Sequence, residues 1–122
     1  MLEYLYLATE FCPASLRQWI RKRNQDNTVV DNRLTLIKWF SEVCEGIQYL
    51  HGYNERGILH QDIKPSNILL TRNGKIKIID FGSSTIYSQK NPSTGGGTQL
   101  YKPSEQQDAI CSKTVDIYPL GK

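Results

Sequence analysis

The sequence predicts an α+β fold in which helices dominate, because it contains one long amphipathic stretch, one hairpin signal and the composition of a folded unit. Its 122 residues are 39% hydrophobic and 22% charged, which is typical of a single globular domain. Asn73-Gly74 separates two short apolar runs and is a strong hairpin signal. Apolar side chains also recur at helical spacing: Leu36, Phe40, Val43, Ile47 and Leu50.

The first quarter of the chain is expected to contain a strand and a short helix. Residues 4–10 are rich in Tyr, Leu and Thr, which suits a mostly buried strand. Ser15 is followed three positions later by Gln18, as in a capping box, so a helix should begin there and run to about Arg23. The polar stretch 25–32 then predicts a loop.

The remaining elements follow from periodicity and turn chemistry. The apolar stripe predicts a long helix from about Leu34 to about Tyr53, with the stripe facing the core. Residues 68–71 and 75–79 are expected to be two strands joined by a tight turn. The stretch 83–97 has three consecutive glycines and little periodicity, so it predicts a surface loop of the length usually reserved for function or disorder.

The charge pattern argues against a nucleic-acid partner. The net charge of +3 comes from 15 basic and 12 acidic residues spread along the chain. The densest basic run, Arg21-Lys22-Arg23, suits the C-terminal end of a helix, where cations are favoured by the helix dipole. A nuclear-targeting or docking role is the alternative interpretation of this run.

Cysteine usage and hydropathy indicate an intracellular, cytoplasmic segment. Cys12, Cys44 and Cys111 are far apart, odd in number and without a CxxC pair, as expected of free thiols in a reducing compartment. No stretch approaches the roughly 20 apolar residues of a membrane span. The apolar opening, residues 1–8, is short and lacks the basic region of a signal peptide. No membrane contact is therefore expected within this segment.

The candidate chemistry lies on either side of the predicted hairpin. Phosphoryl transfer needs a carboxylate to orient the attacking hydroxyl and accept its proton, and a lysine to neutralise the moving phosphoryl group. It also needs an amide and a second carboxylate to hold magnesium. The runs 60–67 and 80–82 supply that set in order: Asp62, Lys64, Asn67 and Asp80. Asp80-Phe81-Gly82 alone would be a weak signal, but its spacing from the first run makes the combination specific.

These runs resemble the catalytic loop, HRDxKxxN, and the magnesium loop, DFG, of the eukaryotic protein kinase family. The resemblance covers essentially the whole chain, since residues 97–105 resemble the end of the activation loop and residues 115–121 the start of the central helix of the large lobe. Lys64, two positions after Asp62, is typical of serine/threonine kinases, and Thr98 agrees. The resemblance implies ATP and Mg²⁺ as cofactors and a protein as substrate.

The resemblance also implies a role for each residue of the catalytic and magnesium loops. Asp62 is expected to be the catalytic base and Lys64 the γ-phosphate contact. Asn67 and Asp80 are expected to be the magnesium ligands. His60 is expected to pack structurally.

A hinge for adenine is implied at the start of the chain. Thr9 stands in the gatekeeper position, and the backbone groups of Glu10 and Cys12 are placed to bond adenine. Leu69 is expected to form the floor of the adenine site. Because a hinge works through its backbone, these side-chain identities carry little information, and Cys12 is not expected to be a reactive thiol.

The implied fold is a truncated protein-kinase-like fold, with a hinge strand, a mainly helical C-lobe and a short catalytic-loop hairpin. Residues 1–122 are expected to form part of a kinase domain, from the hinge to the start of the central helix. The glycine-rich phosphate loop, the strand lysine and the helix glutamate of the small lobe are absent from them. The C-terminal helices of the large lobe are absent as well. The isolated chain is therefore expected to be inactive.

Within the family, three segments most resemble the stress-responsive kinases that phosphorylate the alpha subunit of translation initiation factor 2. These segments are residues 5–12, 46–51 and 97–106. The resemblance implies that this subunit is the substrate and that the full-length protein dimerises through its N-terminal lobe.

Three positions depart from the family pattern. Gln61 stands where many kinases have an arginine that pairs with a phosphate on the activation loop, which predicts less dependence on phosphorylation at sites such as Thr94. Ser104 stands where proline is expected before Glu105. Pro119 lies in the expected central helix and should disturb it.

These departures leave a rival interpretation, in which the chain is a non-catalytic, pseudokinase-like binding module or an inactive fragment. The intact set of Asp62, Lys64, Asn67 and Asp80 argues against it. A binding module has no reason to keep a general base and its metal ligands.

Overall fold

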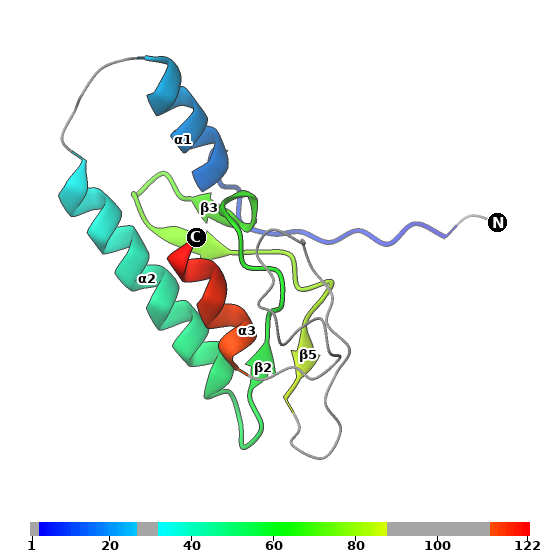
Figure 1. Cartoon of the computed structure of the whole chain (residues 1–122). Coiled ribbons are helices and arrows are strands. Elements are labelled where there is room, and N and C mark those ends of the chain that lie inside the picture. Colours follow the sequence, from blue (N-terminus) through cyan, green and yellow to red (C-terminus); the bar gives the residue numbers. More distant parts are fainter. Residues whose placement is uncertain (1–2, 27–31, 88–112) are drawn as a thin grey trace.

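The structure is a computed structural model that describes residues 3–26, 32–87 and 113–122 (Figure 1). It combines helices with two small antiparallel sheets, so the predicted α+β class is confirmed. In chain order the elements are β1 (Ala14–Ser15), α1 (Leu16–Gln25), α2 (Arg33–His51), β2 (Ile58–Leu59), η1 (Pro65–Asn67), β3 (Ile68–Leu70), β4 (Ile76–Ile78), β5 (Thr85–Ile86), α3 (Thr114–Ile117) and η4 (Tyr118–Gly121).

The predicted hairpin is present as β3 and β4. The two strands are antiparallel, with Ile68 opposite Ile78 and Leu70 opposite Ile76. Gly74 has φ +70° in the connecting turn, a conformation that glycine adopts without strain. The short strand β1 pairs with the other edge of β3, which gives the sheet order β1-β3-β4.

The first helix begins with the predicted capping box. The Oγ of Ser15 accepts from the backbone N–H of Gln18 at 3.2 Å, and the Oε1 of Gln18 accepts from the backbone N–H of Ser15 at 2.7 Å. Two backbone donors at the helix start are thereby satisfied. The helix continues to Gln25, slightly beyond the predicted end. Of the loop predicted over 25–32, residues 27–31 lie outside the described parts.

The long helix α2 is present, and three positions of its predicted stripe, Val43, Ile47 and Leu50, are buried. The prediction is wrong for Phe40, which is 52% exposed, while the adjacent Trp39 is only 8% exposed. The indole N–H of Trp39 donates to the carbonyl of Gly74 at 3.1 Å. The hairpin turn therefore meets α2 at Trp39, whereas Phe40 lies partly exposed in the wall of an apolar cavity.

Two apolar clusters hold the elements together. In the larger one, α2 contributes Val43 and Ile47, which pack on Ile63 and Ile68. In the smaller one, Leu59 of β2 packs against Val115 of α3. Ile63 follows Asp62 directly and Leu59 precedes His60, so the run 60–62 is held by a core cluster at each end.

The strand predicted over residues 4–10 is wrong. The segment is extended but forms no assigned strand, and Leu5 is 98% exposed. Figure 1 shows it projecting away from the body of the molecule. Its apolar side chains are typical of a buried strand, but no strand pairs with the segment in the described part of the chain, so these side chains stay exposed.

The loop predicted over residues 83–97 is also wrong in part. Residues 85–86 form β5, which pairs antiparallel with β2 so that Leu59 lies opposite Thr85. Two strands of two residues each give no periodicity that a sequence pattern can detect. Residues 88–97 lie outside the described parts.

The proline at position 119 coincides with a change of helix type. The α-helix α3 ends at Ile117, and the 3₁₀-helix η4 follows with Pro119 in its first turn. This is where a residue without a backbone N–H is tolerated. The predicted disturbance of the helix is therefore present.

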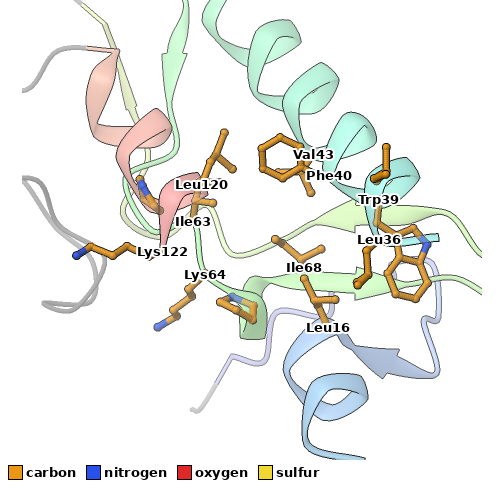
Figure 2. A pocket seen from close by; sticks show the side chains of 13 residues that line it. Leu16, Leu36, Trp39, Phe40, Val43, Ile63, Lys64, Ile68, Leu120 and Lys122 are labelled. Carbon is orange, nitrogen blue, oxygen red and sulfur yellow. The ribbon is translucent and has the colours of Figure 1, made fainter. Parts of the chain in front are cut away.

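An apolar cavity of about 460 Å³ lies between α1, α2, η1 and η4 (Figure 2). Phe40, Val43 and Leu120 contribute to its walls, and Lys64 and Lys122 reach its rim. These walls offer no carboxylate for a metal ion. Among the described residues, no helix is both long and apolar enough to cross a bilayer.

The turn between α2 and β2 provides a sharp test of packing. A Cβ on Gly57, which has φ +84°, would clash with the carbonyl oxygen of His51, whereas one on Gly74 would meet nothing within 4 Å. Gly74→Ala should cost about 1–2 kcal/mol of unfolding free energy, for the left-handed backbone alone. Gly57→Ala should cost about 1–3 kcal/mol more, because of the clash. Urea denaturation of the two variants measures this difference, and equal losses would contradict it.

Candidate functional site

The carboxylate of Asp62 lies at the centre of the site. The amide nitrogen Nδ2 of Asn67 donates to its Oδ2 at 3.1 Å and also to the backbone carbonyl of Asp62 at 2.9 Å. The Nζ of Lys64 lies 3.6 Å from the same Oδ2. Three of the four residues singled out in the sequence therefore converge within one loop, with a cation beside the carboxylate.

The fourth residue, Asp80, is brought to this loop by the end of β4. The backbone N–H of Ile79 donates to the carbonyl of Asn67 at 2.9 Å, directly beyond the Ile68–Ile78 pair of the sheet. Asn67 and Asp80 are thus placed on adjoining strand ends. Asp80 has φ +64° and its Oδ1 accepts from the N–H of Gly82 at 3.3 Å, which turns the chain away after the strand.

His60 links the two motifs through its ring. The N–H of Asp62 donates to Nδ1 at 3.1 Å, and Nε2 lies 2.9 Å from the carbonyl oxygen of Ile79. These partners suit a neutral ring with its proton on Nε2. The ring also packs edge-on against Phe81, at 5.0 Å between centroids. The fully buried His60 thus has the structural contacts expected of it.

The donor set fits a magnesium ion that also binds phosphate. Because the Asn67 nitrogen is occupied by Asp62, its carbonyl oxygen faces the other way, and Asp80 adds carboxylate oxygens. Magnesium in nucleotide sites needs only one or two protein carboxylates besides phosphate oxygens. The described residues hold no group of three or more His, Cys, Asp or Glu side chains that could form an all-protein metal site. The oxygen pair therefore suits a metal shared with a nucleotide.

The residues expected to bind adenine gather beside the same sheet. Leu69 of β3 lies opposite Lys77 of β4, so their side chains share one face of the sheet. The ammonium of Lys77 lies 3.2 Å from the carboxylate of Glu10. Cys12 is half-buried with a free thiol, and Thr9 is exposed. Glu10 and Leu69 thus lie on the same face of the sheet, opposite the face that packs on α2.

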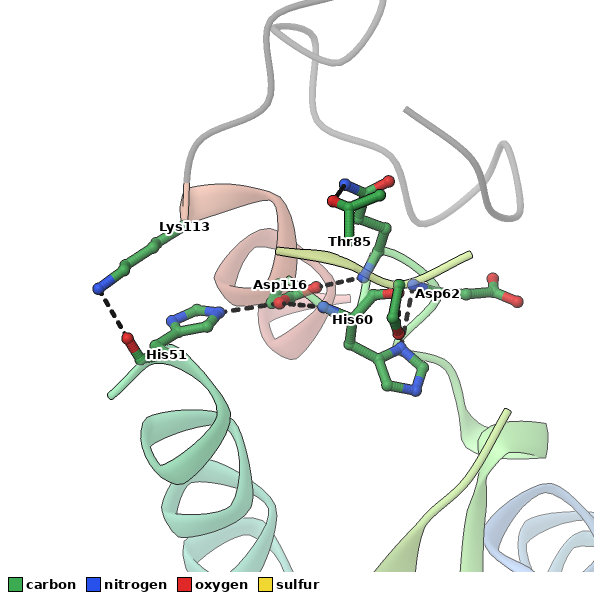
Figure 3. Close-up of polar contacts among 8 residues, drawn as sticks. His51, His60, Asp62, Thr85, Lys113 and Asp116 are labelled. Carbon is green, nitrogen blue, oxygen red and sulfur yellow. Dashed lines mark hydrogen bonds and ion pairs between the residues drawn. The ribbon is translucent and has the colours of Figure 1, made fainter. Parts of the chain in front are cut away.

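Asp116 is a functional candidate that the sequence did not reveal. It is fully buried, and its carboxylate accepts from the backbone N–H groups of His60 at 2.8 Å and Gln61 at 2.7 Å (Figure 3). The Nε2 of His51 lies 2.8 Å from its Oδ2. The sequence offered one signal for this role, a carboxylate within the apolar run 115–120. A carboxylate buried in such a run is costly unless it has hydrogen-bond partners. Asp116 connects the end of α2 to the catalytic loop.

Gln61, the departure from the family pattern, has its own partner. Its backbone has φ +68°, and its side chain is 4% exposed with Nε2 donating to the Oγ1 of Thr85 at 2.8 Å. Thr85 was missed because its strand was predicted as loop. Thr94, Thr98, Ser104, Glu105 and Cys111 lie outside the described residues.

Comparisons with known proteins identify the family of the chain. Residues 2–122 match the family model described as protein kinase domain. The chain is 35% identical to the interferon-induced, double-stranded RNA-activated protein kinase of Rattus norvegicus, and the match covers 96% of this chain and 23% of that protein. It is 35% identical to serine/threonine-protein kinase Nek3 of Mus musculus, over 97% of this chain and 23% of that protein.

A third relative is the MAP kinase kinase skh1/pek1 of Schizosaccharomyces pombe, at 36% identity over 96% of this chain and 32% of that protein. The chain therefore spans about a quarter to a third of the length of these relatives. The family model covers nearly all of the chain, and the names of all three relatives describe kinases. The chain belongs to the protein kinase family, and its fold is a truncated kinase-like α+β fold.

Proposed function

We propose that the protein of which this chain is part is a serine/threonine kinase that transfers the γ-phosphate of ATP to a protein hydroxyl. The observation that carries the proposal is the surroundings of the Asp62 carboxylate, which lies 3.1 Å from the Asn67 amide and 3.6 Å from the Lys64 ammonium. A base oriented in this way, with a cation beside it and with Asn67 and Asp80 on adjoining strand ends, suits phosphoryl transfer.

Each residue has one task in this mechanism. Asp62 orients the hydroxyl of the substrate and accepts its proton as the hydroxyl oxygen attacks phosphorus. Lys64 lies beside the carboxylate and offsets the negative charge of the transferred group. Asn67 and Asp80 would hold Mg²⁺, which would neutralise charge on the phosphate oxygens. The backbone of Glu10 and Cys12 and the side chain of Leu69 hold adenine.

We propose the alpha subunit of translation initiation factor 2 as the substrate. The support is the resemblance of residues 5–12, 46–51 and 97–106 to the stress-responsive kinases. The same resemblance supports dimerisation of the full-length protein, and the widely spaced cysteines without a CxxC pair support a cytoplasmic location.

The test is transfer of radiolabelled phosphate by the purified full-length protein to this subunit and to a generic basic acceptor protein. Label on serine or threonine of the subunit supports the whole proposal. Label on the generic acceptor alone keeps the kinase activity and rejects the substrate. Absence of label on every acceptor, including the protein itself, rejects the kinase activity and favours a binding role.

Replacement of Thr94, the candidate phosphorylation site, should have little effect. Because Gln61 carries no charge to pair with a phosphate, Thr94→Ala in the full-length protein should retain activity within about twofold of wild type. Phosphatase treatment of the wild-type protein before the assay is the matching control and should also leave the rate unchanged. A loss of activity in either experiment would contradict the prediction.

A further inference from the structure

We infer that Gln61 and Thr85 form a positioning pair, in which one neutral hydrogen bond holds the backbone that presents Asp62. The bond joins the Nε2 of Gln61 to the Oγ1 of Thr85 at 2.8 Å (Figure 3). The catalytic part of this inference rests on the proposed function, while its structural part does not.

The backbone of Gln61 needs outside support. Its φ of +68° lies in the left-handed region, which is sparsely populated by residues other than glycine, asparagine and aspartate. Such conformations persist only where surrounding contacts over-determine them. Gln61 has one such contact at its backbone N–H, which donates to Asp116, and another at its side-chain amide, which donates to Thr85. Because Gln61 directly precedes Asp62, the backbone conformation of Gln61 sets the direction in which the carboxylate of Asp62 points.

Thr85 is itself fixed to the loop that it supports. Its strand pairs with β2, where it lies opposite Leu59, two residues before Gln61. The hydroxyl of the preceding residue, Ser84, donates to the carbonyl of His60 at 3.2 Å. The segment that follows Asp80 is therefore joined to the catalytic loop by strand pairing and by the side-chain hydrogen bonds of Thr85 and Ser84, each of which joins uncharged groups.

The neutrality of the pair has a functional consequence. A hydrogen bond between an amide and a hydroxyl is not screened by salt and needs no phosphate to form, unlike an ion pair between an arginine and a phosphorylated loop. The catalytic loop can thus be held in its working conformation from the moment the chain folds.

Amide hydrogen exchange of the full-length protein tests the structural part without any need for activity. Thr85→Val keeps the shape of the side chain and removes the acceptor, so residues 58–62 and 84–86 should exchange about five- to tenfold faster. Thr85→Ser keeps the hydroxyl and should retain wild-type protection. Equal protection in Thr85→Val and wild type would overturn the inference. Equal loss in Thr85→Ser and Thr85→Val would also overturn it, because packing of the methyl group would then be the cause.

A second variant, Gln61→Met, tests whether the faster exchange in Thr85→Val comes from loss of this bond or from a general loss of folding. Gln61→Met keeps the length of the side chain and removes the donor. Combined with Thr85→Val, it should add nothing to the exchange rates of the single variants, since both remove the same bond. Additive effects in this double-mutant cycle would show that the two side chains do not act through one shared bond, and would overturn the inference.

Kinetics then separate positioning from simple stability. In an active protein, Thr85→Val should lower kcat about five- to tenfold with KM for ATP unchanged, and Thr85→Ser should restore kcat. A raised KM with unchanged kcat would overturn the positioning role. If the wild-type protein transfers no phosphate, the proposed function fails. The hydrogen-exchange data alone then decide whether the bond between Gln61 and Thr85 holds the loop.

Discussion

Asp62→Asn should lower phosphoryl transfer by the full-length protein by about 10²–10⁴-fold, the range expected when a general base is removed. Asparagine has nearly the same shape as aspartate and can still accept from the Asn67 amide through its oxygen. It cannot accept the proton of the attacking hydroxyl, and it leaves Lys64 without the carboxylate that lies 3.6 Å from it. The loss should therefore fall on kcat, measured by steady-state kinetics with labelled ATP.

A matched control for this variant is Asp26→Asn. Asp26 is an exposed aspartate at the C-terminal end of α1, where its backbone N–H donates to the carbonyl of Lys22. The change is chemically identical to Asp62→Asn, so it should leave kcat at the wild-type value. Equal rates for Asp62→Asn and wild type would remove Asp62 from the mechanism. A cellular function that survives this variant would favour the binding-module interpretation.

The local features of the fold could be predicted because each depends on residues close together in the chain. The capping box needs only Ser15 and Gln18, the hairpin only the turn around Gly74, and α2 only its apolar spacing. The catalytic and magnesium motifs are local as well. Their meeting follows from the hairpin, which brings Ile79 back to Asn67.

The features that were missed depend on contacts between distant segments. The pairing of β2 with β5 joins residues that carry no strand signal of their own. The burial of Trp39 depends on where the hairpin turn meets α2, which the stripe alone does not specify. The role of Asp116 depends on donors more than fifty residues away. Sequence patterns identify groups capable of chemistry, whereas the groups that hold them in place emerge from the fold.

Asp116→Ala should destabilise the protein by on the order of 4 kcal/mol, because it leaves buried donors without an acceptor and each costs about 1–3 kcal/mol. The carboxylate of Asp116 is fully buried and accepts from the backbone N–H groups of His60 and Gln61, with the ring of His51 as a third partner. Urea denaturation of the full-length protein, followed by tryptophan fluorescence, measures the loss against Asp26→Ala as the control.

Asp116→Asn separates the two roles of this carboxylate, which are to stabilise the fold and to position the backbone of residues 60–61. Asparagine keeps one carbonyl oxygen but places an NH₂ group where the second oxygen accepted a hydrogen bond, so either His60 or Gln61 loses its acceptor and faces another donor. We expect a smaller loss of stability than in Asp116→Ala, together with a fall in kcat of about tenfold or more, because Asp62 follows these two residues directly. Wild-type stability in Asp116→Ala would mean that the loop does not depend on this carboxylate. Wild-type kcat in Asp116→Asn would mean that the backbone of residues 60–61 does not direct Asp62, and the positioning argument built on Gln61 would lose its basis as well.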